Sequence, residues 1–241
     1  MLISSFSILL LFISSNTVYK LVKVEYEYTQ ISTQVKKDSS IIVLTQPYRD
    51  SVTKTMNEII GYAENDMQLK QPNSSIGNYF ADAILHSAQK KFNKKVDAAI
   101  VNIGGIRLTQ LKKGQVTKSH IYELMPFENM VVLLSIKGDV LQQFLNHIAS
   151  TGGWPIAGIK MQIKNKQAIN VFINDQPISK DKFYTLATSD YVANGGENAI
   201  MLKTIPKDDK GYLIRDAVFD YIKNSGNKIQ ASEEKRITNV E

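Results

Sequence analysis

Glycines combine with polar side chains in the segment NIGGIR, residues 102–107, which directly follows an apolar run typical of a buried strand. Its residues of interest are Asn102, Gly104, Gly105 and Arg107. Consecutive glycines allow a backbone turn or the close approach of a ligand. An amide side chain donates and accepts hydrogen bonds, and the planar fork of an arginine binds anions. The segment is therefore compatible with a ligand-facing loop, and equally with a tight turn beside a surface arginine.

Two further segments place aromatic rings in loops next to strands. The segment MPFEN, residues 125–129, precedes a strand, and its Phe127 is either a ligand contact or a buried core residue. The segment SDYVANGGEN, residues 189–198, ends another strand. Its candidate site residues are Tyr191, Asn194, Gly195, Gly196 and Glu197. A loop with a plain turn also explains the second segment, but three loops at strand ends could converge on one site.

The residue types exclude several kinds of site. The chain has no cysteine, which excludes disulfides, thiolate nucleophiles and cysteine-based zinc sites. Neither the phosphate-binding pattern G-x-x-x-x-G-K-[ST] nor the dinucleotide pattern G-x-G-x-x-G occurs. The three histidines, His86, His120 and His147, stand far apart, and we expect packed or surface positions for the two in helical patterns, His86 and His147. The sequence thus predicts neither a metal site nor a cofactor in this chain.

The formal net charge of +6 comes from lysines and arginines spread along 241 residues, without a long basic run. We therefore expect a basic, solvated surface and no nucleic-acid partner. At the N-terminus, an apolar stretch at residues 6–13 is followed by Ser14 and Ser15. It is too short for a stable membrane span but fits a secretory signal, which predicts a signal peptide at residues 1–17 and a periplasmic or secreted protein. A buried N-terminal strand is the alternative.

Hydrophobic periodicity predicts one α/β (α+β) domain at residues 68–230, built from a mixed sheet with flanking helices. An N-terminal extension with a leading helix at residues 18–67 precedes it, and a tail at residues 231–241 follows. In the extension, a short apolar run at 41–47 stops at Pro47, and we expect an amphipathic helix at 48–64. The other expected helices are 76–93, capped by Ser74 or Ser75, 139–152 and 211–226, with a short helix or turn within 114–125. The expected strands are 97–103, a pair within 128–138, 159–164, 169–174 and 183–189.

Five blocks of the sequence resemble the C-terminal domain of the 5′-nucleotidase family in their order and spacing. The blocks are residues 72–85, 96–107, 114–129, 133–145 and 184–202. The most diagnostic patterns within them are N-x-GGIR, PFEN and Y-x-ANGG. The resemblance covers about residues 45–225, which is most of the chain.

In that family, the C-terminal domain holds the nucleoside part of the substrate, and two aromatic rings sandwich the base. The resemblance assigns these rings to Phe127 and Tyr191, and it places Asn102 and Arg107 in a ligand-facing loop. Glu197 stands where the family commonly has Asp, which is one methylene shorter. Lys70 lies near the position of an upstream basic residue. The resemblance thus implies a nucleotide or nucleoside ligand.

The catalytic machinery of the family has no counterpart in this sequence. The family's phosphatase domain binds two metal ions through patterns such as Asp-x-His, Gly-Asn-His-Asp/Glu and Gly-His-x-His, none of which occurs here. Because such metals generate hydroxide and hold phosphate oxygens, we expect no catalytic residues in this chain and no hydrolysis by it alone. The leading hypothesis is that it completes a separately encoded metallophosphatase, which would supply the divalent metals. A nucleoside-binding module without a catalytic partner and a structural domain with a decayed site are the alternatives.

Overall fold

The computed structural model describes residues 23, 25–28, 32 and 37–241. The expected signal peptide at residues 1–17 lies outside these residues. The chain divides into two compact units, Met1–Thr45 and Gln46–Glu241. Within the part of the chain that the structure describes, no helix is long and apolar enough to cross a membrane.

Helix α1 (Ser39–Met56) and strand β1 (Ile59–Ala63) differ from the elements that the sequence predicts here. The apolar run at 41–47 is part of this helix, and the Asp38 carboxylate caps the helix start by accepting a hydrogen bond from the backbone N–H of Ser40 at 2.8 Å. The predicted helix at 48–64 ends early, because residues 59–63 pair as a strand with β5 (Gly114–Thr117) and β13 (Lys228–Ile229). The predicted helix is therefore right over 48–56 and wrong over 57–64, since strand pairing is a tertiary effect that local periodicity does not report.

A five-stranded sheet forms the centre of the second unit, with the strand order β12-β6-β11-β3-β7. Its strands are β3 (Ala98–Ile100), β6 (Met130–Lys137), β7 (Ile156–Ala157), β11 (Phe183–Ser189) and β12 (Lys207–Leu213). Strands β3 and β11 run parallel, whereas β6 runs antiparallel to both β11 and β12. The predicted strand pair within 128–138 is thus one strand, and β12 takes the first residues of the helix predicted at 211–226.

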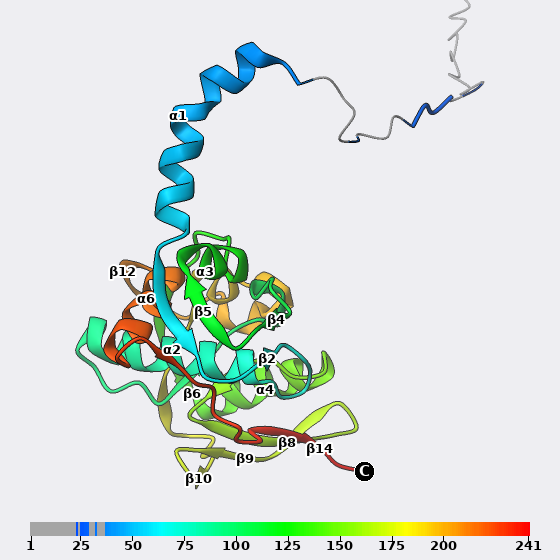
Figure 1. The fold of residues 1–241 in the computed structure, drawn as a ribbon. Helices are drawn as coiled ribbons and strands as arrows, with labels where there is room; N and C mark the ends of the chain where they lie inside the picture. Colours follow the sequence, from blue (N-terminus) through cyan, green and yellow to red (C-terminus); the bar gives the residue numbers. More distant parts are fainter. Residues whose placement is uncertain (1–22, 24, 29–31, 33–36) are drawn as a thin grey trace, which may run out of the picture. The chain divides into compact units, whose positions relative to one another are not determined.

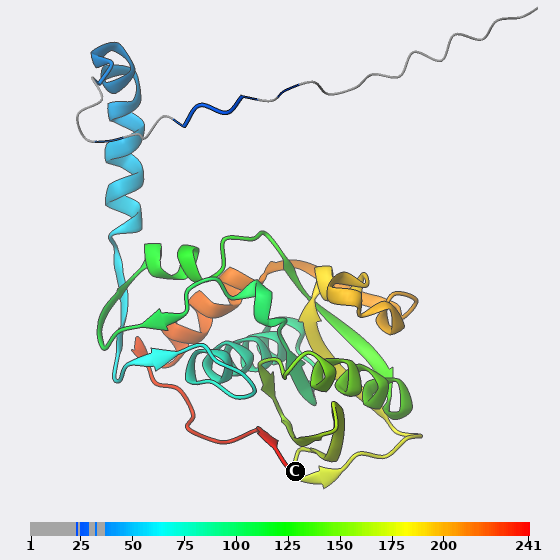
Figure 2. The same cartoon turned by 90° about the vertical axis from the view of Figure 1, so that its right-hand side faces the viewer.

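Helices cover both faces of this sheet (Figure 1, Figure 2). Successive residues of β6 alternate between two hydrophobic clusters, with Val131 and Leu133 in one and Val132 and Leu134 in the other. The first cluster includes the apolar faces of α2 (Ser75–Phe92) and α6 (Ile214–Asn224), and the second includes that of α4 (Gly138–Ser150). Helix α2 confirms its prediction, including the cap, because the Ser74 side chain accepts a hydrogen bond from the N–H of Gly77. The observed fold is therefore a mixed α/β domain with flanking helices.

Three smaller sheets complete this unit, with the strand orders β10-β9-β8-β14, β13-β1-β5 and β2-β4. Their remaining strands are β2 (Met67–Gln68), β4 (Gln110–Leu111), β5 (Gly114–Thr117), β8 (Ile159–Lys164), β9 (Gln167–Ile173), β10 (Gln176–Pro177), β13 (Lys228–Ile229) and β14 (Ile237–Asn239). The short helices are α3 (Lys118–Leu124) and α5 (Asp190–Ala193), and 3-10 turns occupy Ile103–Gly105, Gly196–Asn198 and Ile200–Leu202.

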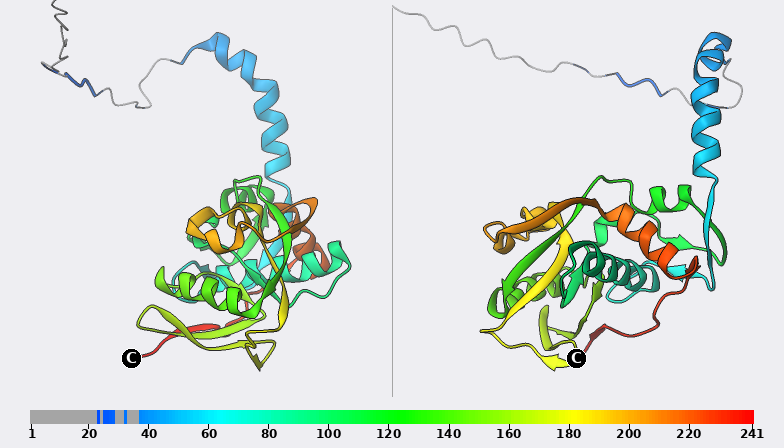
Figure 3. Two further views of the ribbon diagram at one scale, coloured as in Figure 1. Left: turned by 180° about the vertical axis from the view of Figure 1, so that it is seen from behind. Right: turned by 90° about the vertical axis from the view of Figure 1, so that its left-hand side faces the viewer.

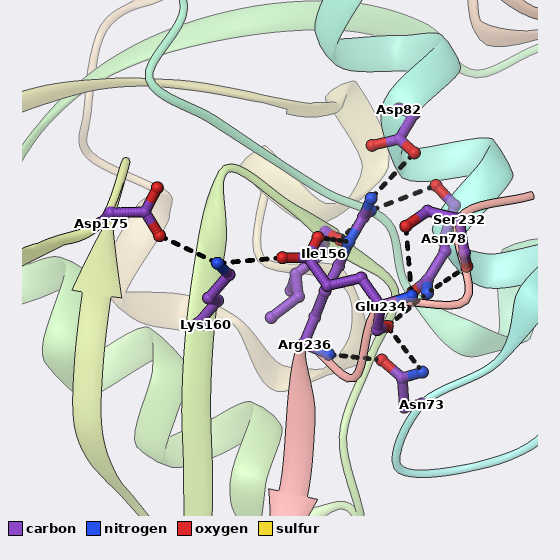
Figure 4. A network of polar contacts seen from close by, with 9 residues as sticks. All are labelled: Asn73, Asn78, Asp82, Ile156, Lys160, Asp175, Ser232, Glu234 and Arg236. Atoms are coloured by element: carbon purple, nitrogen blue, oxygen red, sulfur yellow. Dashed lines mark hydrogen bonds and ion pairs between the residues drawn. The ribbon is translucent and has the colours of Figure 1, made fainter.

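The segment at 231–241 contains a strand that the sequence does not predict. Strand β14 pairs in parallel with β8, and Figure 3 shows this C-terminal segment beside the β8–β9 hairpin. The adjacent Arg236 is buried and bonds to Asp82 of α2 (Figure 4). A three-residue strand carries too little periodicity to be recognised from the sequence.

Candidate functional site

Three predicted loops meet at one edge of the central sheet. Because β3 and β11 are parallel and β6 is antiparallel to them, the ends of β3 and β11 lie beside the start of β6. The Thr188 hydroxyl at the end of β11 donates to the backbone oxygen of Ile100 at the end of β3, over 2.9 Å. This edge therefore brings together the three segments 102–107, 125–129 and 189–198.

A cavity of about 320 Å³ opens at this edge. Its lining residues are Asn102, Gly104, Gly105, Arg107, Phe127, Asn129, Tyr191 and Glu197. All but Asn129 are residues that the sequence singles out. Asn129 belongs to the same PFEN pattern as Phe127, and this shared loop is the signal that could have found it. The volume lies within the range of about 300–1,000 Å³ that is typical of small-molecule sites.

The NIGGIR loop contacts the Glu197 loop directly. The buried Asn102 side chain donates through Nδ2 to Oε1 of Glu197 at 3.2 Å. A Cβ atom on Gly104 would lie 3.1 Å from the same Oε1 atom, and one on Gly105 would lie 2.9 Å from Oδ1 of Asn102. The two glycines therefore allow the amide and the carboxylate to approach at the cavity wall.

The Tyr191 ring is held by its own loop and remains 47% exposed. A Cβ atom on Gly196 would lie 2.6 Å from the ring, and Gly195 has a φ of +94°, which favours glycine. The backbone N–H of Glu197 donates to the Tyr191 hydroxyl at 3.4 Å. Asn194, Gly195 and Gly196 thus shape the loop but do not line the cavity.

Two charged residues that the sequence analysis missed support the aromatic loops. The Asp190 carboxylate accepts from the N–H of Met130 at 3.0 Å and from that of Tyr191 at 2.8 Å, which ties the second and third loops together. The buried Arg215 donates to the backbone oxygen of Phe127 at 3.4 Å, and its guanidinium lies 4.2 Å from the centre of the Tyr122 ring. Neither residue lines the cavity, and Asp190 lies within the segment 189–198 without being one of its candidate site residues.

Arg107 is exposed and makes few contacts. Its Nη1 donates to the backbone oxygen of Gly104 at 3.4 Å, and its guanidinium carbon lies 5.8 Å from the centre of the Phe127 ring. An arginine has five N–H donors, so most of the donors of Arg107 have no protein acceptor among the described residues. This guanidinium is positioned to bind an acceptor or anion that enters the cavity.

Lys70 lies outside this group of residues. It is exposed and borders a separate, shallow hollow together with Pro72, Asn73 and Trp154, which only Ile103 of the NIGGIR loop reaches. The structure therefore does not bring Lys70 to the site defined by the other residues.

The three histidines have separate environments. His86 stacks on Tyr221, Nδ1 of His120 accepts from the N–H of Thr117 at 3.0 Å, and Nε2 of His147 contacts the backbone oxygen of Glu197 at 2.7 Å. Among residues 23, 25–28, 32 and 37–241, no group of three or more His, Asp or Glu side chains could hold a metal ion. The single carboxylate at the cavity, Glu197, does not fit the ligand set of a two-metal centre.

Known proteins resemble this chain in sequence. Residues 52–204 match the model of the family described as 5'-nucleotidase, C-terminal domain. The trifunctional nucleotide phosphoesterase YfkN of Bacillus subtilis is 25% identical over 89% of this chain and 16% of its own length. A 5'-nucleotidase of Vibrio parahaemolyticus is 25% identical over 80% of this chain and 35% of its own length.

The fold of this chain also resembles the folds of solved structures. The 5'-nucleotidase precursor from Thermus thermophilus superposes with a TM-score of 0.73 and 23% identity, over 84% of this chain and 42% of that chain. The chain thus spans well under half the length of these relatives. Since the family model covers more than half of the chain, the protein belongs to the 5'-nucleotidase C-terminal domain family.

Proposed function

We propose that the cavity at the sheet edge binds a nucleoside or nucleotide, with the base held between Phe127 and Tyr191. The observation that carries this proposal is that two rings from different strand ends line one cavity and stay 41% and 47% exposed. They make no stacking contact with each other in the part of the chain that the structure describes. Stacking of a base on an aromatic side chain contributes about 1–3 kcal/mol.

The polar groups of the cavity match the rest of a nucleotide. The Glu197 carboxylate accepts hydrogen bonds, and the hydroxyls of a ribose are suitable donors. The Arg107 guanidinium suits a phosphate or the ribose oxygens, and the amide of Asn129 offers a donor and an acceptor to the edge of a base.

In this proposal the domain is the substrate-binding part of a two-chain nucleotidase. A separately encoded metallophosphatase would supply the divalent metals and the hydrolytic step. Among the described residues, Glu197 is the one carboxylate that lines the cavity, which supports a hydrolytic step outside this domain. The apolar stretch at 6–13 supports export of the protein to the periplasm or the exterior, with a mature N-terminus near residues 15–20.

Calorimetric titration of the purified chain tests the binding half of this proposal. Adenosine and AMP should bind, whereas ribose alone should bind far more weakly because it lacks the base. Absence of adenosine and AMP binding to the folded protein would contradict the assigned ligand class.

A pull-down from native extracts tests the two-chain half. The tagged chain alone should release no phosphate from AMP, with or without added divalent metals. The eluate that contains its partner should release phosphate, and chelation should abolish that release. A homogeneous chain that hydrolyses AMP, or an eluate without metal-dependent activity, would count against the two-chain arrangement. In the latter case, retained nucleoside binding would favour a non-catalytic binding module.

A further inference from the structure

We propose that His147 is a positioning residue of the cavity, whose Nε2–H fixes the backbone of Glu197 and thereby the direction of its carboxylate. The predicted effect on binding rests on the proposed function, whereas the contact itself does not. His147 lies on α4, outside the three loops that form the cavity.

The contact indicates which ring nitrogen of His147 carries a proton. Nε2 of His147 lies 2.7 Å from the backbone oxygen of Glu197, which is short for a hydrogen bond between nitrogen and oxygen. Because a carbonyl oxygen only accepts, Nε2 must carry the proton. The histidine therefore donates to the Glu197 backbone in both its neutral and its charged form.

The Glu197 backbone needs such support. Glu197 has φ 53° and ψ 29°, and the next residue, Asn198, has a φ of 61°. A side-chain-bearing residue adopts this left-handed region only where its surroundings fix it. The other contact of the Glu197 backbone, with the Tyr191 hydroxyl, is longer at 3.4 Å. The bond from His147 is thus the shortest restraint on the residue that presents the carboxylate.

The imidazole itself is fixed by the core. Its ring meets the buried Trp154 edge to face, with centres 5.8 Å apart and planes at 87°. Trp154 in turn meets the buried Phe144 of α4 at 5.7 Å and 81°. His147 therefore links a rigid part of the core to an exposed loop, and this arrangement preorganises the carboxylate before a ligand arrives.

Three substitutions separate this role from a general effect on folding. His147→Phe keeps a ring against Trp154 but removes the donor. His147→Gln keeps an N–H donor near the position of Nε2. His147→Asn is a second variant without the contact, because its amide is too short to reach Glu197.

The first measurement needs no ligand. Asn102 donates through Nδ2 to the Glu197 carboxylate, so the side-chain amide signals of Asn102 in NMR spectra report where that carboxylate lies. These signals should shift in His147→Phe and His147→Asn and stay near their original positions in His147→Gln. Unshifted signals in both donor-less variants would overturn the proposal.

The second measurement compares adenosine with adenine, which lacks the ribose. A neutral hydrogen bond contributes about 0.5–1.5 kcal/mol, so His147→Phe should weaken adenosine binding by about 2- to 12-fold. Adenine binding should be unchanged, and His147→Gln should restore adenosine affinity. Equal losses for both ligands, or no loss for adenosine, would overturn the positioning role. If adenosine fails to bind the unmodified protein, the proposed function fails, while the Asn102 signals still decide the proposal.

Discussion

Two arginines of this domain differ in their exposure and in their hydrogen bonds. Arg107 at the cavity is exposed, and among the described residues its side chain has one long hydrogen bond of 3.4 Å. Arg236 is only 6% exposed and donates to the oxygens of Ile156, Asn78, Asp82 and Glu234 over 2.8–3.3 Å (Figure 4). We call the group of Arg236, Asp82, Asn78, Asn73 and Glu234 the C-terminal clamp.

The difference separates a binding group from a structural one. A buried charge must find its partners within the protein, and Arg236 does so at the junction of α2, β7 and the C-terminal segment. The side-chain amide of Asn78 extends the clamp by donating to the backbone oxygens of Ser232 and Glu234. Arg107, by contrast, keeps most of its donors available at a cavity. We therefore expect clamp substitutions to act on stability and cavity substitutions to act on affinity.

Replacing Arg236 should give the largest effect. Arg236→Ala leaves the Asp82 carboxylate, which is 18% exposed, without its cation and removes the hydrogen bonds to the backbone oxygens of Asn78 and Ile156. Loss of one partner from a buried pair costs about 3–5 kcal/mol, and the partial exposure of Asp82 reduces this to about 3 kcal/mol. Thermal unfolding followed by the fluorescence of Trp154 should show a decrease in Tm of about 6–12 °C.

The exposed neighbour Lys235 provides the control for the clamp. Lys235→Ala should leave the Tm within about 2 °C of the original, as is usual for surface substitutions. Adenosine affinity of the folded Arg236→Ala protein should be unchanged. A large loss of affinity without a loss of stability would break the division between clamp and cavity.

Replacing Tyr191 should act on affinity. Loss of a stacking ring costs about 1–3 kcal/mol, so Tyr191→Ala should weaken adenosine binding by roughly 5- to 150-fold. Tyr191→Phe should weaken it much less, because the ring remains. Tyr62 on β1 is a matched control, since it is 45% exposed, close to the 47% of Tyr191, and lies outside the cavity. Tyr62→Ala should leave the calorimetric affinity unchanged, and a comparable loss there would remove the stacking interpretation.

Replacing Arg107 should change affinity with little change in stability. A hydrogen bond to a charged group contributes about 1.5–3 kcal/mol, so Arg107→Ala should weaken AMP binding by about 10- to 150-fold. If the guanidinium contacts phosphate, AMP binding falls more than adenosine binding, and if it contacts the ribose, both fall alike. The exposed Lys180, outside the cavity lining, is the control, and its replacement by alanine should affect neither ligand. A drop in Tm as large as that of Arg236→Ala would show that Arg107 is structural.

Replacing Glu234 should give the smallest effect on stability, and this effect should depend on pH. The hydrogen bond from the Lys160 ammonium, at 2.9 Å, holds the pKa of the Glu234 carboxyl below its ordinary value. Its contribution to stability is therefore present above that ordinary value, about 4.5, and is lost as the pH falls through the lowered pKa. Because both side chains are partly exposed, Glu234→Gln should cost only about 0.5 kcal/mol at neutral pH. The difference should vanish in acid.

The sequence predicts regular elements where a local signal is strong. The Ser74 cap and the spacing of the apolar residues predict helix α2. Three loop patterns predict most of the residues that line the cavity. The sequence does not predict β1, which forms by pairing with β13 and β5, and it assigns the last residues of the polar strand β12 to the start of a helix. Asp190, Arg215 and His147 are missed because each acts on a loop distant in sequence. Local patterns report which residues form an element, whereas support between elements appears only in three dimensions.

A double-mutant cycle on the two rings tests the central claim most directly. Adenosine would be titrated calorimetrically into the unmodified protein, Phe127→Ala, Tyr191→Ala and the double variant, after each is shown to be folded. If both rings stack on one base, each single substitution weakens binding and the double variant loses less than the sum, because neighbouring contacts are not additive. Undiminished adenosine binding in the folded single variants, or losses that simply add, would contradict a base held between Phe127 and Tyr191.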